Sequence, residues 1–207
     1  MSSLQYFDIS NNYFYGRIPS ALIAMQRLIY LNLSSNNLTD IIPKGFQNLR
    51  ELRQLDLHSN KLSGPIDSGL MLLQSAEYID FSNNELSGPL PSMWPIVSGL
   101  IYSLQHLNLS SNQLNGSLAY NGAIPFENLK VLDISNNRFS GQLPSFNFIY
   151  SLEILRLSNN EVSGPLPGAL FMEGSLVLSE LDLSHNNLSG TFFVQPCFGF
   201  FLYCLQY

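Results

Sequence analysis

The sequence predicts an α/β repeat protein: about eight similar units that stack into a right-handed, curved solenoid, with a parallel sheet on the concave side and irregular or 3₁₀ segments on the convex side. An asparagine recurs at intervals of 23 to 28 residues. Apolar residues stand five and three positions before each of these asparagines, and a Gly-x-Ile/Leu-Pro phrase follows four of the eight. Periods of about 20 to 50 residues are typical of solenoids, because one unit cannot bury its apolar face alone.

The first element of each unit is expected to be a short strand. Leu31 and Leu33, like Leu55 and Leu57, alternate with polar residues. Alternation at period two places the leucines on one face of a strand and the polar residues on the other. Strands one repeat apart must then run parallel to one another.

The recurring asparagine is expected to form a ladder through the coil. Its side-chain amide offers donors and an acceptor, which suit buried turn groups that no regular strand pairing satisfies. The predicted ladder consists of Asn12, Asn36, Asn60, Asn84, Asn112, Asn137, Asn160 and Asn186.

The second element is expected to turn the chain away from the strand. In the first unit Gly16 supplies a permissive backbone and Pro19 fixes one angle. Asp40 replaces the glycine in the second unit, and Asp67 and Ala119 replace the proline in two others. A return segment then buries large apolar residues, such as Leu22, Phe46, Leu70, Trp94 and Leu170.

These motifs bring a resemblance to a known family. The pattern resembles leucine-rich repeats, and the Leu/Val-Ser-Gly-Pro-Leu-Pro phrases at residues 86–91 and 162–167 are similar to the plant-specific class. Leu-Asn-Leu-Ser and Leu-Asp-Leu-Ser phrases at residues 31–34, 107–110 and 181–184 are typical of plant receptor-like proteins and receptor-like kinases. The resemblance implies a leucine-rich-repeat domain of eight repeats over residues 1–192, a fragment of such an ectodomain, followed by an atypical apolar tail at residues 193–207.

The resemblance also implies a function. It predicts a non-catalytic recognition module of a plant cell-surface receptor, which binds a peptide, a protein or a cell-wall-derived ligand in defence or developmental signalling, with a co-receptor kinase as a further partner. Two alternatives stay open: a secreted inhibitor of a microbial cell-wall-degrading enzyme, similar to polygalacturonase-inhibiting proteins, and an intracellular scaffold. A leader and a spanning helix elsewhere in the gene would favour the receptor, a leader alone the inhibitor, and neither the scaffold.

Outward residues of the predicted strands are the candidate binding residues. Most of them repeat a polar Asp/Asn and Ser template, which fits a solvated face equally well. The departures are aromatic or basic, and rigid aromatic side chains bury much area at little cost in rotamer entropy. We therefore expect ligand contacts at Tyr30, His58, Tyr78 and His106, with Arg156 as a clamp for a ligand carboxylate. The competing interpretation is that the tyrosines only fill a pleated face.

Composition argues against several functions. Fifteen acidic and nine basic residues give a net charge of −6, without the basic cluster that nucleic acid requires. Asp56, His58 and Ser82 are the residue types of a hydrolase triad, and Asp56 with Asp80 resembles a glycosidase pair, but a sheet face lacks the cleft that such chemistry needs. We expect no enzyme, no cofactor and no metal site, since the three histidines, His58, His106 and His185, stand in separate repeats.

Targeting and modification motifs complete the expectations. No signal peptide opens the sequence, and the apolar tail, which holds both cysteines, is too short and too interrupted to span a bilayer. Plasma-membrane or extracellular localisation is therefore expected from the resemblance alone. Candidate glycosylation sequons, which a template rich in Asn and Ser also produces by accident, begin at Asn32, Asn37, Asn108, Asn115 and Asn187.

Overall fold

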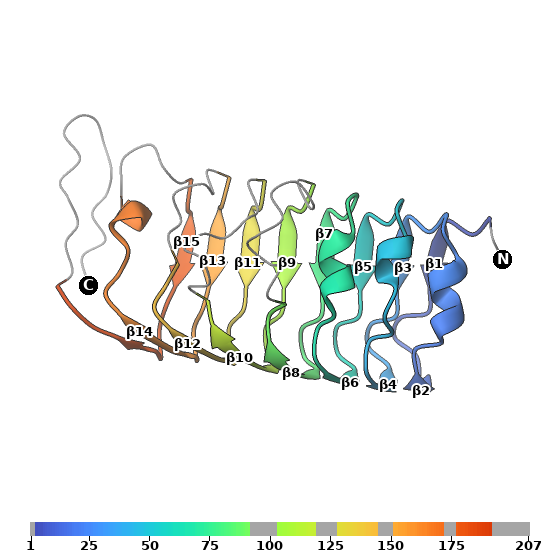
Figure 1. The fold of residues 1–207 in the computed structure, drawn as a ribbon, viewed down its shortest axis with the longest axis horizontal. Helices are drawn as coiled ribbons and strands as arrows, with labels where there is room; N and C mark the ends of the chain where they lie inside the picture. The colour runs from blue at the N-terminus through green and yellow to red at the C-terminus, as the bar shows by residue number, and fades with distance from the viewer. Residues whose placement is uncertain (1–2, 92–102, 119–127, 145–150, 172–176, 192–207) are drawn as a thin grey trace.

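The computed structural model is an elongated solenoid built on two parallel sheets (Figure 1). It describes residues 3–91, 103–118, 128–144, 151–171 and 177–191. Each repeat contributes one strand to the first sheet and the next strand to the second, so that strands of one sheet alternate along the chain with strands of the other. The predicted parallel-strand solenoid with little helix is confirmed.

The first sheet has eight strands of three residues each, and it pairs them in sequence order. In-register partners place equivalent positions side by side, as in Tyr6 with Tyr30 and Tyr78 with His106. The strands are β1 (Tyr6–Asp8), β3 (Tyr30–Asn32), β5 (Gln54–Asp56), β7 (Tyr78–Asp80), β9 (His106–Asn108), β11 (Val131–Asp133), β13 (Ile154–Arg156) and β15 (Glu180–Asp182).

A second parallel sheet runs along the edge that lies lowest in Figure 1, and the sequence did not predict it. Its strands begin soon after each ladder asparagine, where we expected only a turn. They are β2 (Tyr15–Arg17), β4 (Asn37–Asp40), β6 (Lys61–Gly64), β8 (Glu85–Pro89), β10 (Gln113–Ser117), β12 (Arg138–Gly141), β14 (Glu161–Gly164) and β16 (Asn187–Leu188).

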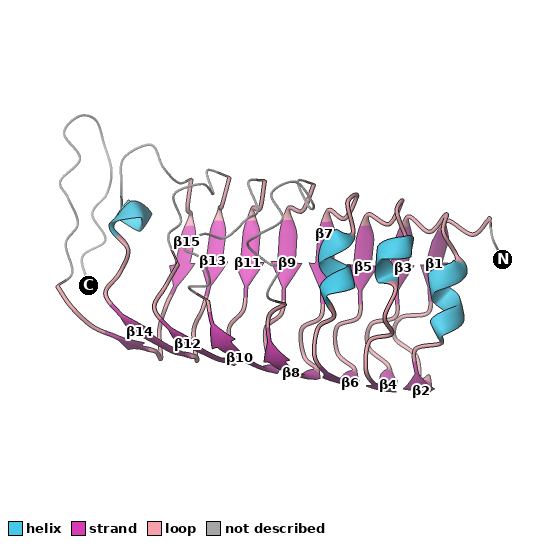
Figure 2. Cartoon of the chain, in the orientation of Figure 1, coloured by secondary structure: helices cyan, strands magenta, loops and turns pink. Residues whose placement is uncertain are grey.

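The return segments carry short 3₁₀ turns, as expected, and the described ranges contain no α-helix (Figure 2). The expected apolar anchors Leu22, Phe46, Leu70 and Leu170 are buried, whereas Trp94 lies outside the described residues. The 3₁₀ turns are η1 (Ser20–Ala24), η2 (Phe46–Asn48), η3 (Ser68–Leu72) and η5 (Gly168–Phe171).

A single apolar core runs the length of the solenoid between the first sheet and the return segments. Leu31, Leu55 and Leu107, at equivalent strand positions, are almost completely buried. Burial of one leucine side chain contributes about 2 kcal/mol. Ala76 stands where other repeats carry leucine, and its smaller side chain is also buried in the core.

The asparagine side chains connect successive repeats. Asn60 donates through Nδ2 to the carbonyl oxygens of Leu33 and Leu57 at 3.0 and 3.2 Å, and its Oδ1 accepts the N–H of Leu38 at 3.0 Å. Asn12 differs, because its side-chain Nδ2 donates only within its own repeat, to the carbonyl oxygens of Ile9 and Ser10. The same inter-repeat pattern recurs at Asn36, Asn84, Asn112, Asn137, Asn160 and Asn186.

The turn glycines explain one departure from the template. Gly64, with φ of 76°, occupies the left-handed region that glycine adopts without strain. Asp40 stands at the equivalent position with φ of 71° and forms an ion pair with Arg17 at 2.7 Å. The second repeat therefore keeps the glycine conformation with an aspartate in it.

The predicted boundary between the repeat domain at residues 1–192 and the apolar tail at residues 193–207 stays a prediction. The tail at residues 193–207 lies outside the described residues, as do Cys197 and Cys204. Within the described ranges, no helix has the length and apolarity to cross a membrane.

Candidate ligand-binding face

The outer face of the first sheet presents three rows of side chains. Strand register aligns the first row from Tyr6 to Glu180 and the second from Asp8 to Asp182, and the third row follows directly after the strands, from Ser10 to Ser184. Neighbouring strands lie about 4.8 Å apart, so residues of one row stand within contact distance of each other. This outer face holds all five predicted contact residues, each of them partly exposed.

Two aromatic stacks dominate the first row. The rings of Tyr6 and Tyr30 have centroids 4.2 Å apart and planes within 7°. The rings of Tyr78 and His106 have centroids 4.4 Å apart and planes within 12°. Each stack joins two neighbouring strands, so the stacked rings face one another along the row. Gln54 of β5 is the residue between the two stacks.

The acidic residues of the second row have a structural role that the sequence analysis missed. Asp80 Oδ1 accepts both the N–H and the hydroxyl of Ser82, at 2.8 and 2.6 Å. Asp133 binds Ser135 in the same way. Asn32 Oδ1 makes the equivalent bond to a backbone N–H at 2.9 Å. The Asp/Asn-x-Ser spacing is therefore a turn motif, which explains why the template repeats it.

The remaining carboxylate oxygens face the aromatic row. Asp80 Oδ2 accepts from the Tyr78 hydroxyl at 3.2 Å and from Asn108 Nδ2 at 3.1 Å. Burial raises the pKa of Tyr78 above its ordinary value, and the charges of Asp80 and Asp56 add to this effect. Tyr78 therefore keeps its proton at neutral pH and stays a hydrogen-bond donor.

The two histidines predicted to contact a ligand, His58 and His106, both lie near carboxylates. Burial lowers the pKa of His106 despite the nearby carboxylates of Asp80 and Asp133. His106 therefore stacks on Tyr78 as a neutral ring at pH 7. His58 Nδ1 lies 2.7 Å from Asp56 Oδ1, a geometry that suits a donated proton.

The residue types of a hydrolase triad are not assembled as one. His58 contacts Asp56, whereas the Ser82 hydroxyl donates to Asp80 on the next strand. Among the described residues, no group of three or more His, Cys, Asp or Glu side chains is placed to hold a metal ion.

Arg156 is already engaged by carboxylates of this chain. Its guanidinium binds both carboxylate oxygens of Glu180, with Nη2 to Oε2 at 2.8 Å, and Nη1 lies 3.5 Å from Asp133 Oδ2. Hydrogen bonding between the two residues raises the pKa of Arg156 and lowers that of Glu180. A ligand carboxylate would have to displace Glu180 from the Arg156 guanidinium. The role of Arg156 as a clamp for a ligand carboxylate therefore stays a prediction.

The sequons divide between the two sheets. Asn32 and Asn108 lie on the outer face, where their Nδ2 atoms donate to Tyr30 and Asp80 at 3.2 and 3.1 Å. The other three, which are exposed on the second sheet, are Asn37, Asn115 and Asn187.

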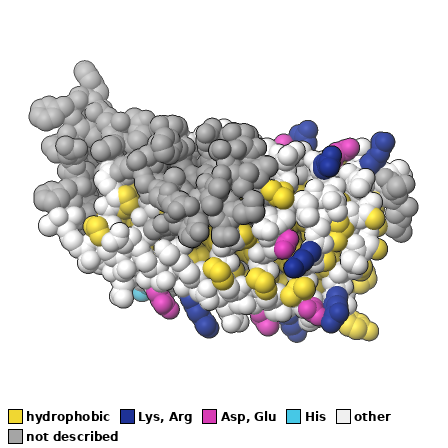
Figure 3. Space-filling model, in the orientation of Figure 1, with side chains coloured by type: hydrophobic (Ala, Val, Ile, Leu, Met, Phe, Trp, Pro, Cys, Tyr) yellow, Lys and Arg dark blue, Asp and Glu magenta, His cyan; other side chains and the backbone are white. Residues whose placement is uncertain are grey.

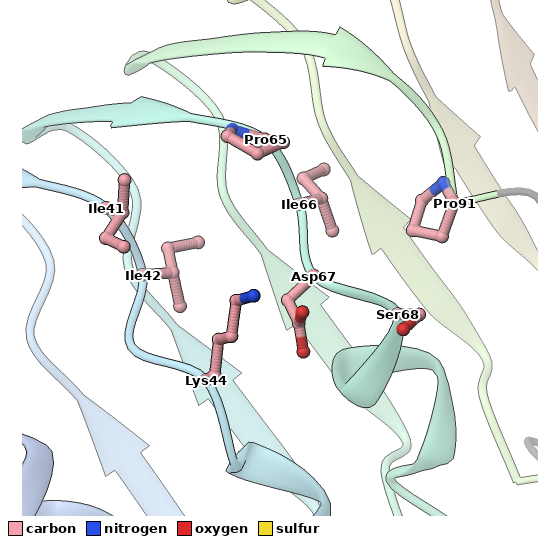
Figure 4. A pocket seen from close by; sticks show the side chains of 8 residues that line it. All are labelled: Ile41, Ile42, Lys44, Pro65, Ile66, Asp67, Ser68 and Pro91. Carbon is pink, nitrogen blue, oxygen red and sulfur yellow. The ribbon is translucent and has the colours of Figure 1, made fainter.

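A pocket away from this face lies between the second sheet and the 3₁₀ turns (Figure 4). It measures about 260 Å³, and three successive repeats line it, with Ile41 and Ile66 on its walls and Lys44 and Asp67 beside them. Asp67 Oδ2 accepts the N–H of Gly69 at 3.0 Å and thus caps η3. The replacement of proline by Asp67 was the only sequence signal for this pocket.

On the side of the molecule shown in Figure 3, basic and acidic side chains lie next to one another.

The solenoid, its asparagine ladder and its open outer face define a class of repeat proteins that present a rigid sheet to solvent. A family model described as leucine rich repeat matches residues 1–62. A second model of the same description matches residues 75–95, 103–121, 128–147, 151–172 and 177–198. The chain therefore belongs to the leucine-rich repeat family, as its sequence predicted.

Plant receptor kinases are among the similar proteins. A probable inactive receptor kinase of Arabidopsis thaliana is 50% identical over 96 residues, which are 46% of this chain and 9% of that protein. A structure of the plant peptide hormone receptor RGFR1 in complex with RGF2 matches with a TM-score of 0.81 and 33% identity, over 89% of this chain and 28% of the receptor chain.

A third similar protein is the Arabidopsis receptor kinase HAESA, in complex with the peptide hormone IDA and the co-receptor SERK1. Its TM-score is 0.78 at 31% identity, over 90% of this chain and 30% of that chain. This chain thus spans less than a third of the length of each of these proteins.

Proposed function

We propose that the chain is a non-catalytic recognition module of a plant cell-surface receptor, and that it binds a peptide or protein segment on the outer face of the first sheet. The observation that carries this proposal is the pair of aromatic stacks, Tyr6 on Tyr30 and Tyr78 on His106. Stacking and sheet pairing fix these rings before a ligand arrives, so a ligand buries aromatic area without paying for side-chain ordering.

The similar structures support this proposal. RGFR1 and HAESA were each solved with a peptide hormone, and HAESA also with a co-receptor. We extend both kinds of partner, and a location at the outer side of the plasma membrane, to the protein that contains this chain. No contact in the described part of the chain favours the inhibitor or the scaffold.

A binding selection tests the proposal. A library of random 12-residue peptides is selected on the 207-residue chain, and the affinity of the retained peptides is measured. Tyr30→Ala, Tyr78→Ala and His106→Ala are each expected to weaken binding about tenfold, because each removes part of an aromatic anchor. Tyr15→Ala is the matched control, since Tyr15 is 87% exposed on β2, away from this face. Affinities equal to that of the wild-type chain in all four variants would refute the proposal.

A further inference from the structure

The outer face of the first sheet carries most of the net charge of the chain. Its three rows hold one guanidinium, that of Arg156, and six carboxylates. With neutral histidines this face contributes −5 to a formal net charge of −6. The rest of the sequence has nine acidic and eight basic residues and is nearly balanced. The six carboxylates are Asp8, Asp56, Asp80, Asp133, Glu180 and Asp182.

The uncompensated charge lies beside the aromatic stacks. Arg156 pairs with Asp133 and Glu180, so the charge near β11 to β15 is partly offset. Among the described residues, no Lys or Arg side chain forms an ion pair with Asp8, Asp56 or Asp80. These three carboxylates belong to β1, β5 and β7, the strands that also carry or separate the stacked rings.

The two stacks flank β5, whose Gln54 stands between them in the same row. Tyr30 and Tyr78 lie on strands about 9.6 Å apart, twice the strand spacing. Each ring uses one face for its own stack, so a ligand side chain has the outer edges of the two rings and the end of Gln54 to contact.

The strand between the two stacks also carries a carboxylate, that of Asp56. Asp56 follows Gln54 by two residues on the same strand and is only 7% exposed. Its Oδ1 accepts the N–H of His58 at 3.1 Å and contacts the His58 ring, and its charge reaches Tyr78, whose pKa it helps to raise. Aromatic rings beside a carboxylate attract a cation both through their quadrupoles and through the carboxylate charge.

We infer that the outer face takes a cationic extended segment, and that one Arg or Lys side chain of that segment contacts the ring of Tyr30 or Tyr78 next to Asp56. This inference rests on the proposed function and adds the chemical class of the ligand. An extended segment that crosses β1 to β9 spans about 19 Å, which about six residues cover. The same charge would repel acidic ligands, such as anionic wall polysaccharides.

The peptide selection tests this inference when the retained sequences are read. Peptides retained by the wild-type chain are expected to contain Lys and Arg at least threefold more often than the library does. One retained peptide is then compared with its Arg→Gln version. Asp56→Asn is expected to weaken the Arg peptide about tenfold and the Gln version less than twofold. Asn is a suitable replacement, because Asn32 and Asn108 make the same backbone bond.

Asp182→Asn is the matched control, since it removes the same charge from the same row, five strands away from Asp56. It is expected to leave the affinity within twofold. Peptides without basic enrichment whose binding still depends on Tyr30 and Tyr78 would overturn the cationic ligand and leave the proposed function standing. Basic peptides that bind Asp56→Asn as tightly as wild type would overturn the placement of the basic side chain next to Asp56. Binding that is independent of both tyrosines, or no retained peptide at all, would overturn both proposals.

Discussion

The Oδ1 atom of Asn60 accepts the backbone N–H of Leu38, which belongs to the preceding repeat, at 3.0 Å. The two residues are 22 positions apart in the sequence. This bond and its equivalents tie each coil to the one before it, and they hold the strands of the outer face in register.

Loss of this bond should destabilise the solenoid. Asn60→Ala leaves the buried N–H of Leu38 and the carbonyl of Leu33 without the bonds that the side chain supplies, so we expect the free energy of unfolding to fall by about 3 kcal/mol. Urea denaturation followed by circular dichroism measures the change. Asn12→Ala, which removes bonds within one repeat only, should cost about 1 kcal/mol. Equal losses in the two variants would contradict the inter-repeat role.

Asp40 should be replaceable by the residue of the template. Its φ of 71° is unfavourable for an L side chain, so we expect Asp40→Gly to raise the free energy of unfolding by about 0.5 to 1 kcal/mol. The ion pair that is lost, with an Arg17 side chain 81% exposed, contributes little. Gly64→Ala is the reverse test, because its Cβ would meet Ile41 Cγ2 at 2.8 Å. Thermal unfolding should rank Asp40→Gly above wild type and Gly64→Ala below it; the opposite order would refute this account.

Stability should depend on pH through His106. Burial holds the pKa of folded His106 below its ordinary value of 6.5, although Asp80, Asp133 and Asp56 oppose the shift and Arg156 assists it. The unfolded chain therefore takes up the proton first, and stability should decrease as the pH falls below 6.5 toward the folded pKa. His106→Phe should flatten the stability profile in that window. Denaturation midpoints across this range decide, and an unchanged slope in His106→Phe would refute the prediction.

The sequons should differ in occupancy when the chain is secreted from plant cells. Asn37 and Asn115 are exposed on the second sheet, whereas the Nδ2 atoms of Asn32 and Asn108 already donate hydrogen bonds on the outer face. We therefore expect glycans at Asn37, Asn115 and Asn187, with Asn32 and Asn108 mostly unmodified. Peptide mapping by mass spectrometry measures each occupancy. Full occupancy at Asn32 and Asn108 would also place glycans on the proposed binding face and count against it.

The sequence was sufficient for the spine of the molecule. The period and the alternation of Leu31 and Leu33 predicted the first sheet, because a parallel register follows once equal repeats stack. The rows of outward residues followed from the same register, so Tyr78 and His106 could be placed as neighbours. Stacking of their rings could not be predicted, since it depends on rotamers that the pattern leaves free.

The missed features depend on contacts between repeats. The second sheet includes Ser-Gly segments of low strand propensity, such as Ser63 and Gly64 in β6, so local propensity did not reveal it. The pairing of Arg156 with Glu180 joins two different rows on neighbouring strands, which row-by-row comparison does not detect. The Asp-x-Ser spacing did carry a signal that the sequence analysis missed, because an Asp side chain that bonds the backbone two residues on is a common turn motif.

A crystal structure of the chain with the tightest peptide from the selection tests the central claim most directly. We predict that the peptide lies in extended form across β1 to β9, with a basic side chain against Tyr30 or Tyr78, next to Asp56. A peptide seated instead on the second sheet, or in the pocket beside Lys44 and Asp67, would contradict the claim that the outer face of the first sheet is the recognition surface.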